Sequence, residues 1–304
     1  MPGVAGRFDH FTDDAKREEL IVSANGNDSA EIINMFTRRV VHSIKGLDEP
    51  QDVVYVPGFD KIFVANAGDR SVKIFDGKTN ALRRTIDLGD DPDDIRWDEP
   101  SKRVFVGYGK DGTGAIAMFD PATDAHVGND LKTAGGGHPE SFQLEKKGSR
   151  IFVNVPDDGN VVEVLDRKGG PVTKWQLNGA KKNNAMALNE ADHRLYISSR
   201  IPPLLIVFDT ETGKEVARLP AAADCDDIFF DAERKRIYYI AGQGFICVYQ
   251  ENDLDHYELM GKIPTRVGAR TGFFNIFYSE GNLSVGVPPE GNEPAEIWTY
   301  EAVD

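Results

Sequence analysis

The chain of 304 residues is poor in cysteine, in long apolar runs and in basic side chains, and each shortage excludes a class of protein. Its two cysteines, Cys225 and Cys247, are too few for a disulfide framework, and we expect both to be buried, unreactive thiols. No apolar run approaches the roughly 18 residues that a membrane-spanning helix needs. Acidic residues outnumber basic ones by 50 to 35, and the resulting net charge of −15 excludes nucleic acid as an expected partner.

The sequence also lacks the short motifs that mark common catalytic sites. It contains no nucleophile elbow, no phosphate-binding P-loop, no dinucleotide-binding glycine pattern, no zinc-type cysteine spacing and no Cys-x-x-Cys-His haem attachment. The first residues show no charged segment followed by an apolar stretch, so the printed sequence carries no recognisable signal peptide. Clues to function must therefore come from the way the fold groups its side chains.

A strand-like apolar block recurs seven times and predicts the fold. The blocks begin at residues 19, 61, 103, 150, 194, 236 and 282, which are about 42 to 47 residues apart. One strand precedes each block and, in most repeats, two more follow it; four short strands per repeat of this length are typical of a propeller blade. The sequence therefore predicts an all-β protein, a seven-bladed β-propeller with four-stranded antiparallel blades, in one domain spanning residues 1–304. The expected blades cover approximately residues 8–49, 50–91, 92–137, 138–182, 183–224, 225–267 and 268–304.

The repeat carries a recognisable pattern. An apolar-Val-x-Asn block, clearest at Ile62–Asn66, is followed by a Phe-Asp-x-x-Thr turn at Phe75–Thr79. This combination resembles the YVTN-repeat family of β-propellers over residues 8–301, whereas the Gly-His and Trp-Asp signatures of WD repeats are absent. The resemblance implies a propeller fold and little about chemistry. Because many members of that family are exported, it also favours a periplasmic or secreted location, with the signal removed, over the cytoplasm.

The seventh repeat is expected to lack its outermost strand, because the sequence ends shortly after that repeat's third strand at 295–300. In propellers the missing strand commonly comes from the opposite terminus. The residues before Phe8 include Pro2, Gly3 and Gly6, which are poor strand formers. We therefore expect that a short strand, together with an export signal, preceded Met1; the alternative is a seventh blade of three strands.

The starts of the innermost strands predict the position of a functional site. In a propeller these starts line the mouth of the central channel, and every predicted blade places a polar or ionisable group there. The ligand-binding residues expected at the mouth are His10, Asp52, Asp93, His138, Glu140, Asn183, Asp227 and Arg270. Among them, the candidates for catalysis are His138, Asp227, His10 and Arg270.

Oxygen atoms that converge on a narrow channel suit Ca²⁺ or Mg²⁺, so the sequence predicts a divalent metal as a possible cofactor. The expected ligands are Asp93, Glu140, Asn183 and Asp227. The alternative is that these side chains cap the strand starts and bind channel water. His10 and His138 are expected to act as hydrogen-bonded channel residues, as transition-metal or haem ligands, or as a general base. Together with Arg270 they could instead form an anion pocket.

These observations favour a non-enzymatic binding scaffold whose channel mouth holds a metal ion, a small molecule or a protein segment. A metal-dependent, lactonase-like hydrolase or lyase with its active site at the same mouth is the alternative, with Asp227 or His138 as the base. A third hypothesis is a redox propeller in which His10 or His138 ligates iron or copper.

Overall fold

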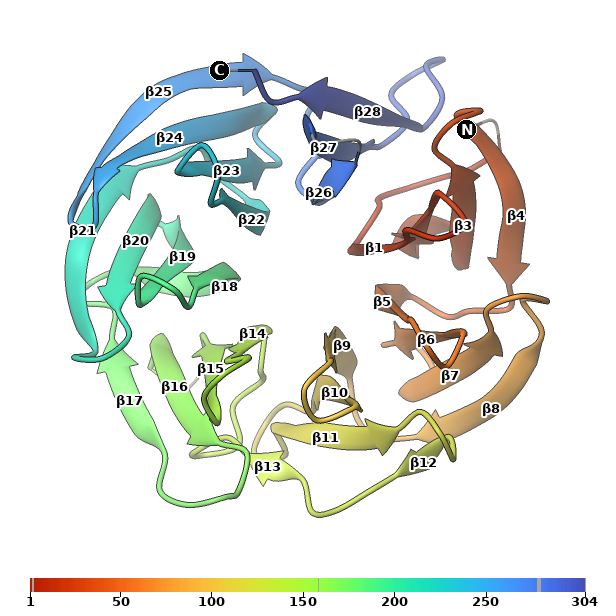
Figure 1. The fold of residues 1–304 in the computed structure, drawn as a ribbon, viewed down its shortest axis with the longest axis horizontal. Coiled ribbons are helices and arrows are strands. Elements are labelled where there is room, and N and C mark those ends of the chain that lie inside the picture. The colour runs from red at the N-terminus through yellow and green to blue at the C-terminus, as the bar shows by residue number, and fades with distance from the viewer. Residues whose placement is uncertain (2, 158, 278–279, 304) are drawn as a thin grey trace.

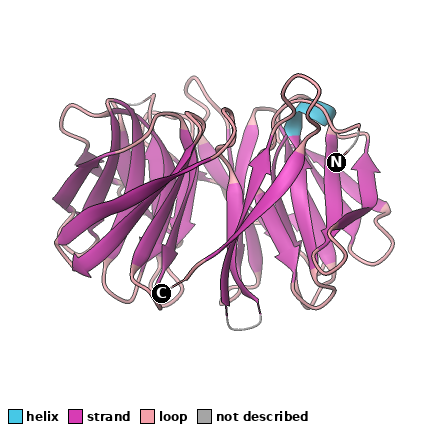
Figure 2. Ribbon diagram, turned by 90° about the horizontal axis from the view of Figure 1, so that it is seen from above, coloured by secondary structure: helices cyan, strands magenta, loops and turns pink. Residues whose placement is uncertain are grey.

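A computed structural model, which describes residues 1, 3–157, 159–277 and 280–303, shows seven antiparallel β-sheets arranged around a central axis (Figure 1). The predicted seven-bladed β-propeller is therefore confirmed. Seen from the side, the strands run between two faces that consist of turns and loops (Figure 2). The described residues contain a single short 3-10 helix, η1 (Asn25–Asn27), and no helix long and apolar enough to cross a membrane.

Within each blade the chain runs from the innermost strand outward. The first two blades consist of β1 (Phe11–Asp14), β2 (Glu19–Ala24), β3 (Ser29–Asn34), β4 (Arg39–Lys45), and β5 (Pro50–Val56), β6 (Lys61–Asn66), β7 (Ser71–Asp76), β8 (Leu82–Asp87). The third and fourth consist of β9 (Pro92–Asp98), β10 (Arg103–Tyr108), β11 (Ala115–Asp120), β12 (Ala125–His126), β13 (Leu131–Lys132), and β14 (Ser141–Leu144), β15 (Arg150–Val155), β16 (Val161–Asp166), β17 (Thr173–Gln176).

The last three blades continue the same order. They consist of β18 (Lys181–Asn189), β19 (Arg194–Ile201), β20 (Pro203–Asp209), β21 (Lys214–Pro220); β22 (Cys225–Asp231), β23 (Arg236–Ala241), β24 (Phe245–Asp253), β25 (His256–Pro264); and β26 (Gly272–Phe277), β27 (Glu280–Val287), β28 (Glu296–Glu301). Within the described residues the seventh blade has three strands, which agrees with the expected absence of its outer strand.

Burial explains why the second strand of each repeat stands out in the sequence. Every residue of β6 is buried, whereas the outer strand β8 is almost entirely exposed. A strand that is covered on both faces becomes a continuous apolar run rather than an alternating one. The core is divided into clusters between neighbouring blades; one of them packs Phe63 of the second blade against Phe119 of the third. Cys225 and Cys247 are buried free thiols in such a cluster, as expected.

The third blade departs from the regular pattern. Its outer strand is split, so that β12 pairs with one end of β11 and β13 pairs with the other. The intervening segment contains Asp130, which accepts hydrogen bonds from His126 (2.6 Å) and from the Tyr108 hydroxyl (2.6 Å). The chain between β11 and β14 is consequently held close to the blade, where it leads into the candidate site.

Buried aspartates join the innermost strands of neighbouring blades. In three places a carboxylate on one blade accepts the backbone N–H of the next: Asp52 from Ile95 (2.8 Å), Asp94 from Phe142 (2.9 Å) and Asp227 from Gly272 (2.8 Å). Because a buried carboxylate without hydrogen bonds would be costly, these bonds stabilise both the side chain and the alignment of the blades. Polar residues at the strand starts therefore have a structural role as well as any role in binding.

Candidate functional site

The innermost strands begin with an irregularity that shapes the channel. In the second blade, Gln51 and Asp52 together lie opposite the single residue Ala65, and the register shifts at the same place in the third, fifth and sixth blades. Such a β-bulge redirects side chains, so two consecutive residues need not alternate between opposite faces of the sheet. These four blades thus supply two successive positions near the channel, and the aligned residues of the other three blades take the same places in the repeat.

We call the set at the first position the mouth ring and the set at the second position the neck ring. The mouth ring consists of Asp9, Gln51, Asp93, Glu140, Asn184, Asp226 and Arg270. The neck ring consists of His10, Asp52, Asp94, Ser141, Ala185, Asp227 and Thr271. The predicted residues are accordingly divided between two levels rather than gathered at one.

His138 lies outside both rings, two residues before Glu140, and so does Asn183. Asn183 precedes the bulge in β18, and its side chain is only 1 % exposed. Its Nδ2 group donates hydrogen bonds to Asn154 Oδ1 (2.8 Å) and to the Val161 carbonyl (2.9 Å), inside the sheets. Asn184 takes the mouth position in this blade and donates to Glu140. The expected grouping of Asn183 with the metal-ligand candidates is therefore corrected to Asn184 as the neighbour of Glu140.

Two residues of the mouth ring, Asp93 and Glu140, come together with His138 as three potential metal ligands. Asp93, His138 and Glu140 each offer one ligand atom, and these atoms all lie within 4.8 Å of one another. The Nε2 atom of His138 lies 3.2 Å from Asp93 Oδ2. His138 is 9 % exposed, so the imidazole is held against the third blade rather than in open solvent. Two of the four predicted ligands, Asp93 and Glu140, are thus joined by a histidine, while Asp227 lies at the neck.

The glycine-rich segment before His138 fixes the orientation of the imidazole. Gly136 has a φ of +71°, and a Cβ atom on it would lie 2.2 Å from the backbone of Gly112. This close approach allows the Gly136 carbonyl to accept hydrogen bonds from Gly112 and Gly114. It also places the Gly109 carbonyl 2.7 Å from His138 Nδ1. Because a carbonyl only accepts, Nδ1 carries a proton and donates it, and Nε2 faces the Asp93 carboxylate.

The carboxylates and the imidazole perturb each other's protonation. Burial and the nearby charge of Asp93 together raise the pKa of Glu140 to about 7, against the opposing influence of His138 and Arg200. Burial by itself would lower the pKa of His138, but the hydrogen bond and charge of Asp93 outweigh it and raise the pKa to about 9. The cluster therefore concentrates negative charge that a single imidazolium does not fully balance.

A second group of charges lies beside this cluster. Asp226 forms ion pairs with Arg200 and with Arg270, whose Nε lies 2.6 Å away, and both guanidinium groups also approach Asp224. Arg270, a predicted binding residue, is therefore engaged with two carboxylates. The sequence pattern does not mark Arg200, which lies near the end of β19 and not in an innermost strand. It does not mark Asp226 either, because the pair Asp226–Asp227 does not show which residue faces the mouth.

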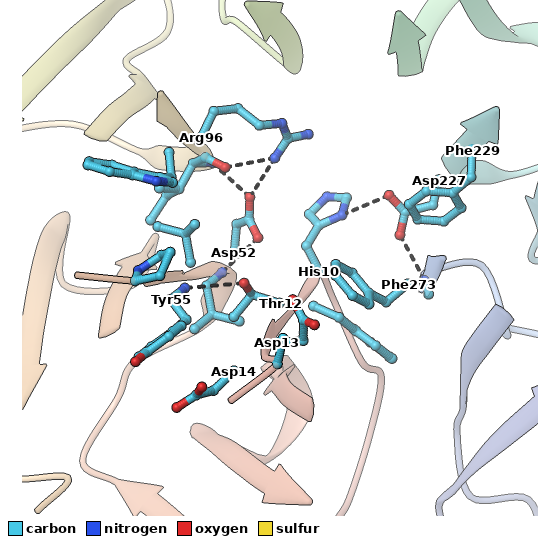
Figure 3. Close-up of a pocket in the computed structure, with 18 of the residues that line it drawn as sticks. His10, Thr12, Asp13, Asp14, Asp52, Tyr55, Arg96, Asp227, Phe229 and Phe273 are labelled. Atoms are coloured by element: carbon cyan, nitrogen blue, oxygen red, sulfur yellow. Dashed lines mark hydrogen bonds and ion pairs between the residues drawn. The ribbon is translucent and has the colours of Figure 1, made fainter. Parts of the chain in front are cut away.

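The neck ring contains a separate buried network (Figure 3). His10 Nδ1 lies 3.1 Å from Asp227 Oδ1, and Asp52 accepts a hydrogen bond from Arg96 Nη1 (3.0 Å). Burial opposes a charge on His10, but the carboxylate of Asp227 raises its pKa well above the ordinary value. Since Asp227 Oδ2 also accepts the Gly272 N–H, each of its carboxylate oxygens already has one partner. His10 and Asp227 thus connect the first, sixth and seventh blades.

Below the neck a cavity of about 890 Å³ continues through the channel. It extends from His10, Asp52 and Asp227 to the turns Ala15–Arg17 and Pro57–Asp60, and aromatic side chains such as Phe229 and Phe273 contribute to its wall. Asp93, His138 and Glu140 are not among the described residues that line this cavity. The neck therefore separates the three-residue cluster from the wide part of the channel.

Comparisons with known proteins support the fold. No family model matches the chain, and no curated protein matches it. The chain is similar in structure to hydrazine synthase of Kuenenia stuttgartiensis, at 14 % identity and a TM-score of 0.81, with 99 % of each chain covered. It is also similar to a chain of the mitotic checkpoint complex, at 14 % identity and a TM-score of 0.77, with 98 % of this chain and 89 % of that chain covered. At such low identity these similarities establish a β-propeller and carry neither a function nor membership of the YVTN-repeat family.

Proposed function

We propose that this propeller is a binding protein that holds a divalent transition-metal ion at its channel mouth, with Asp93, His138 and Glu140 as ligands. The observation that supports the proposal is the convergence of one ligand atom from each residue to within 4.8 Å of the others. Donors bound tetrahedrally at about 2.1 Å from a metal lie about 3.4 Å apart. Binding of a metal would therefore draw the three ligand atoms closer together than they lie here.

The mixed ligand set favours some ions over others. Carboxylates alone suit Ca²⁺ and Mg²⁺, whereas an imidazole shifts the preference toward Zn²⁺, Mn²⁺ or Fe²⁺. The hydrogen bond from His138 Nδ1 to the Gly109 carbonyl supports this role, because metal-bound histidines usually donate their other N–H to such a group. The net charge of −15 also attracts cations toward a mouth lined by carboxylates.

Three protein ligands leave coordination positions open. A small anion, or a carboxylate of a protein segment, can occupy those positions, so the metal would serve as the point of attachment for a ligand. The guanidinium of Arg200, which favours the charged form of Glu140 and pairs with Asp226, would add positive charge beside an anionic ligand. The rigid ring of blades would hold all of these groups in place without rearrangement.

The test is isothermal titration calorimetry on EDTA-treated protein with ZnCl₂, MnCl₂ and CaCl₂. We expect one site per chain, tighter for Zn²⁺ and Mn²⁺ than for Ca²⁺, and a loss of about a hundredfold in affinity in Asp93→Asn and His138→Asn. The matched control is His256→Asn, because His256 also pairs with an aspartate (2.8 Å from Asp253) but is 78 % exposed at its side chain. Equal affinity in the wild type and both mouth variants would contradict the proposal.

A metal-dependent hydrolase is the second candidate, and the open coordination positions favour it. A metal with three protein ligands can polarise a lactone carbonyl and activate a bound water. His138 would be a ligand rather than the base in this scheme, and Asp227 lies at the neck, already bonded to His10 and Gly272. Hydrolysis of γ- and δ-lactones and of p-nitrophenyl esters by the Zn²⁺- or Mn²⁺-loaded protein, lost in His138→Asn, would support it. Absence of turnover would favour the binding function.

A further inference from the structure

The cavity below the neck contains a carboxylate that the repeat does not require. Asp13 lies in β1 opposite Leu20, the second residue of the apolar block in the first blade. In the other six blades the residue at the same place is apolar or aromatic: Tyr55, Trp97, Leu144, Leu188, Phe230 and Phe274. The repeat itself therefore gives no structural reason for an acidic residue at this level of the channel.

Asp13 also lacks a partner in the protein. Among the described residues, its carboxylate makes no ion pair and no hydrogen bond to another residue. Burial and the charge of the adjacent Asp14 raise the pKa of Asp13. The side chain lines the cavity, and Figure 3 shows it turned away from Asp14, which lies on the side of Tyr55. Because a partly buried carboxylate without a cation is unfavourable, a positively charged ligand beside it would stabilise the protein.

The other carboxylates of the cavity already have cations beside them. Asp52 meets Arg96 (3.0 Å), Asp227 meets His10 (3.1 Å), and Asp14 and Asp60 both meet Arg17. Lys16 also lines the cavity and makes no ion pair within the described part of the chain, but it is exposed in the turn after β1. Asp13 is therefore the lining carboxylate that is available to a cationic ligand.

Aromatic side chains line the cavity near this carboxylate. Phe229 and Phe273 lie one residue nearer the neck than the level of Asp13, and Trp97 and Phe230 lie at that level. The sixth, seventh and first blades are consecutive in the ring, so Phe229, Phe273 and Asp13 follow one side of the cavity (Figure 3). Aromatic faces attract cations and also pack against apolar groups, so this wall suits a ligand with both features.

We propose that the cavity below the neck binds an organic monocation, in which a primary or secondary ammonium group is attached to an apolar or aromatic body. The ammonium group pairs with Asp13, and the body lies against Phe229 and Phe273. The volume of about 890 Å³ is within the range of small-molecule sites. Although burial opposes it, Asp227 raises the pKa of His10, and the resulting positive charge disfavours a second cation position at the neck. The neck separates this site from the metal cluster, so neither proposal depends on the other.

The probe is 2-phenylethylamine, titrated by isothermal calorimetry at pH 8, which favours the ionised form of Asp13. 2-Phenylethanol and 3-phenylpropionate carry the same ring with a neutral and an anionic end group. We expect one site per chain for the amine, and binding of the alcohol and the acid that is weaker by about tenfold or more. Asp13→Asn should weaken binding of the amine by a similar factor. The matched control is Asp111→Asn, since Asp111 is an exposed aspartate outside the cavity.

Two further variants provide readouts that a structural role of Asp13 would not produce. Asp13→Leu restores the apolar residue of the other blades, so it should raise the urea midpoint of unfolding while it abolishes binding of the amine. Lys16→Met should leave the affinity for the amine unchanged. Zn²⁺ titration of Asp13→Asn should match the wild type, so a failure at this cavity is distinguishable from a failure of the metal site at the mouth.

Several outcomes would overturn the proposal. They are absence of amine binding to the wild type, equal binding of the amine and the alcohol, and equal affinity for the amine in the wild type and Asp13→Asn. A urea midpoint that falls in Asp13→Leu would also overturn it, because Asp13 would then be required by the fold. Tight binding of 3-phenylpropionate that is lost in Lys16→Met would do the same, since the cavity would then take an anion.

Discussion

Replacement of Glu140 by Gln in metal-free protein should flatten the dependence of stability on pH. The pKa of Glu140 rises from 4.5 to about 7 because the carboxylate is buried and faces Asp93 and Asp226, against the favourable charges of His138 and Arg200. In the unfolded chain the group titrates near its ordinary value. Between pH 4.5 and 7 the native state therefore binds more protons than the unfolded state.

The direction and the size of the change in the free energy of unfolding follow from this difference in proton binding. A raised pKa contributes stability that is fully present below pH 4.5 and is lost as the pH rises through 7. A shift of this size corresponds to about 3 kcal/mol, and partial exposure at the mouth reduces the expected contribution to about 2 kcal/mol. Two other groups also lower the stability as the pH rises. Burial raises the pKa of Asp9 to about 7, and the pKa of His138 is raised to about 9.

The assay is urea denaturation in EDTA at pH 5 and pH 8. The free energy of unfolding of the wild type should fall between these values, and the fall should be about 2 kcal/mol smaller in Glu140→Gln. Glu258→Gln, an exposed change on β25, is the control and should behave as the wild type. An equal fall in wild type and Glu140→Gln would refute the reasoning, because it would show that the mouth does not hold Glu140 against its ionisation.

Three further predictions concern the metal, the blade contacts and the glycine segment. The apparent Zn²⁺ affinity should rise about tenfold per pH unit between pH 7 and 8, because His138 must lose a proton to bind, and calorimetry in buffers of different ionisation enthalpy should detect that proton. Asp227→Ala should lower the free energy of unfolding by about 2 kcal/mol in urea, since it leaves the Gly272 N–H unpaired; the exposed change Asp253→Ala should have little effect. Gly136→Ala should weaken Zn²⁺ binding at least tenfold, whereas Gly46→Ala, which has a similar φ of +77° but no neighbour within 4 Å, should not.

The fold could be predicted because the features that define it are local and repeated. The run at Ile62–Asn66 recurs in each blade because the second strand is covered on both faces, and burial on both faces requires a continuous apolar sequence. That the described residues supply three strands to the seventh blade was also expected, because the last repeat contains three strand-like segments. The split outer strand of the third blade could not be predicted, because β12 and β13 have two residues each and their pairing depends on the intervening turn.

The site was only partly predictable because its geometry depends on the bulges. Asp93 and Glu140 could be selected as mouth residues from their positions at the starts of the innermost strands. The pairs Asp226–Asp227 and Asn183–Asn184 could not be resolved, since a shift of one residue changes the direction in which a side chain points. In blade five the register assigns Asn184 to the mouth ring. Arg200 belongs to the fifth blade, whereas Glu140 and Asp226 belong to the fourth and the sixth. Its place beside them is therefore evident only from the three-dimensional structure.

The most direct test of the proposed function is a crystal structure of the protein soaked in MnCl₂, with anomalous diffraction data. The account predicts an anomalous peak at the channel mouth, within about 2.3 Å of a carboxylate oxygen of Asp93, Nε2 of His138 and a carboxylate oxygen of Glu140. The peak should be absent from crystals of His138→Asn soaked in the same way. Full occupancy of Mn²⁺ at another position, with no peak between these three side chains, would contradict the account.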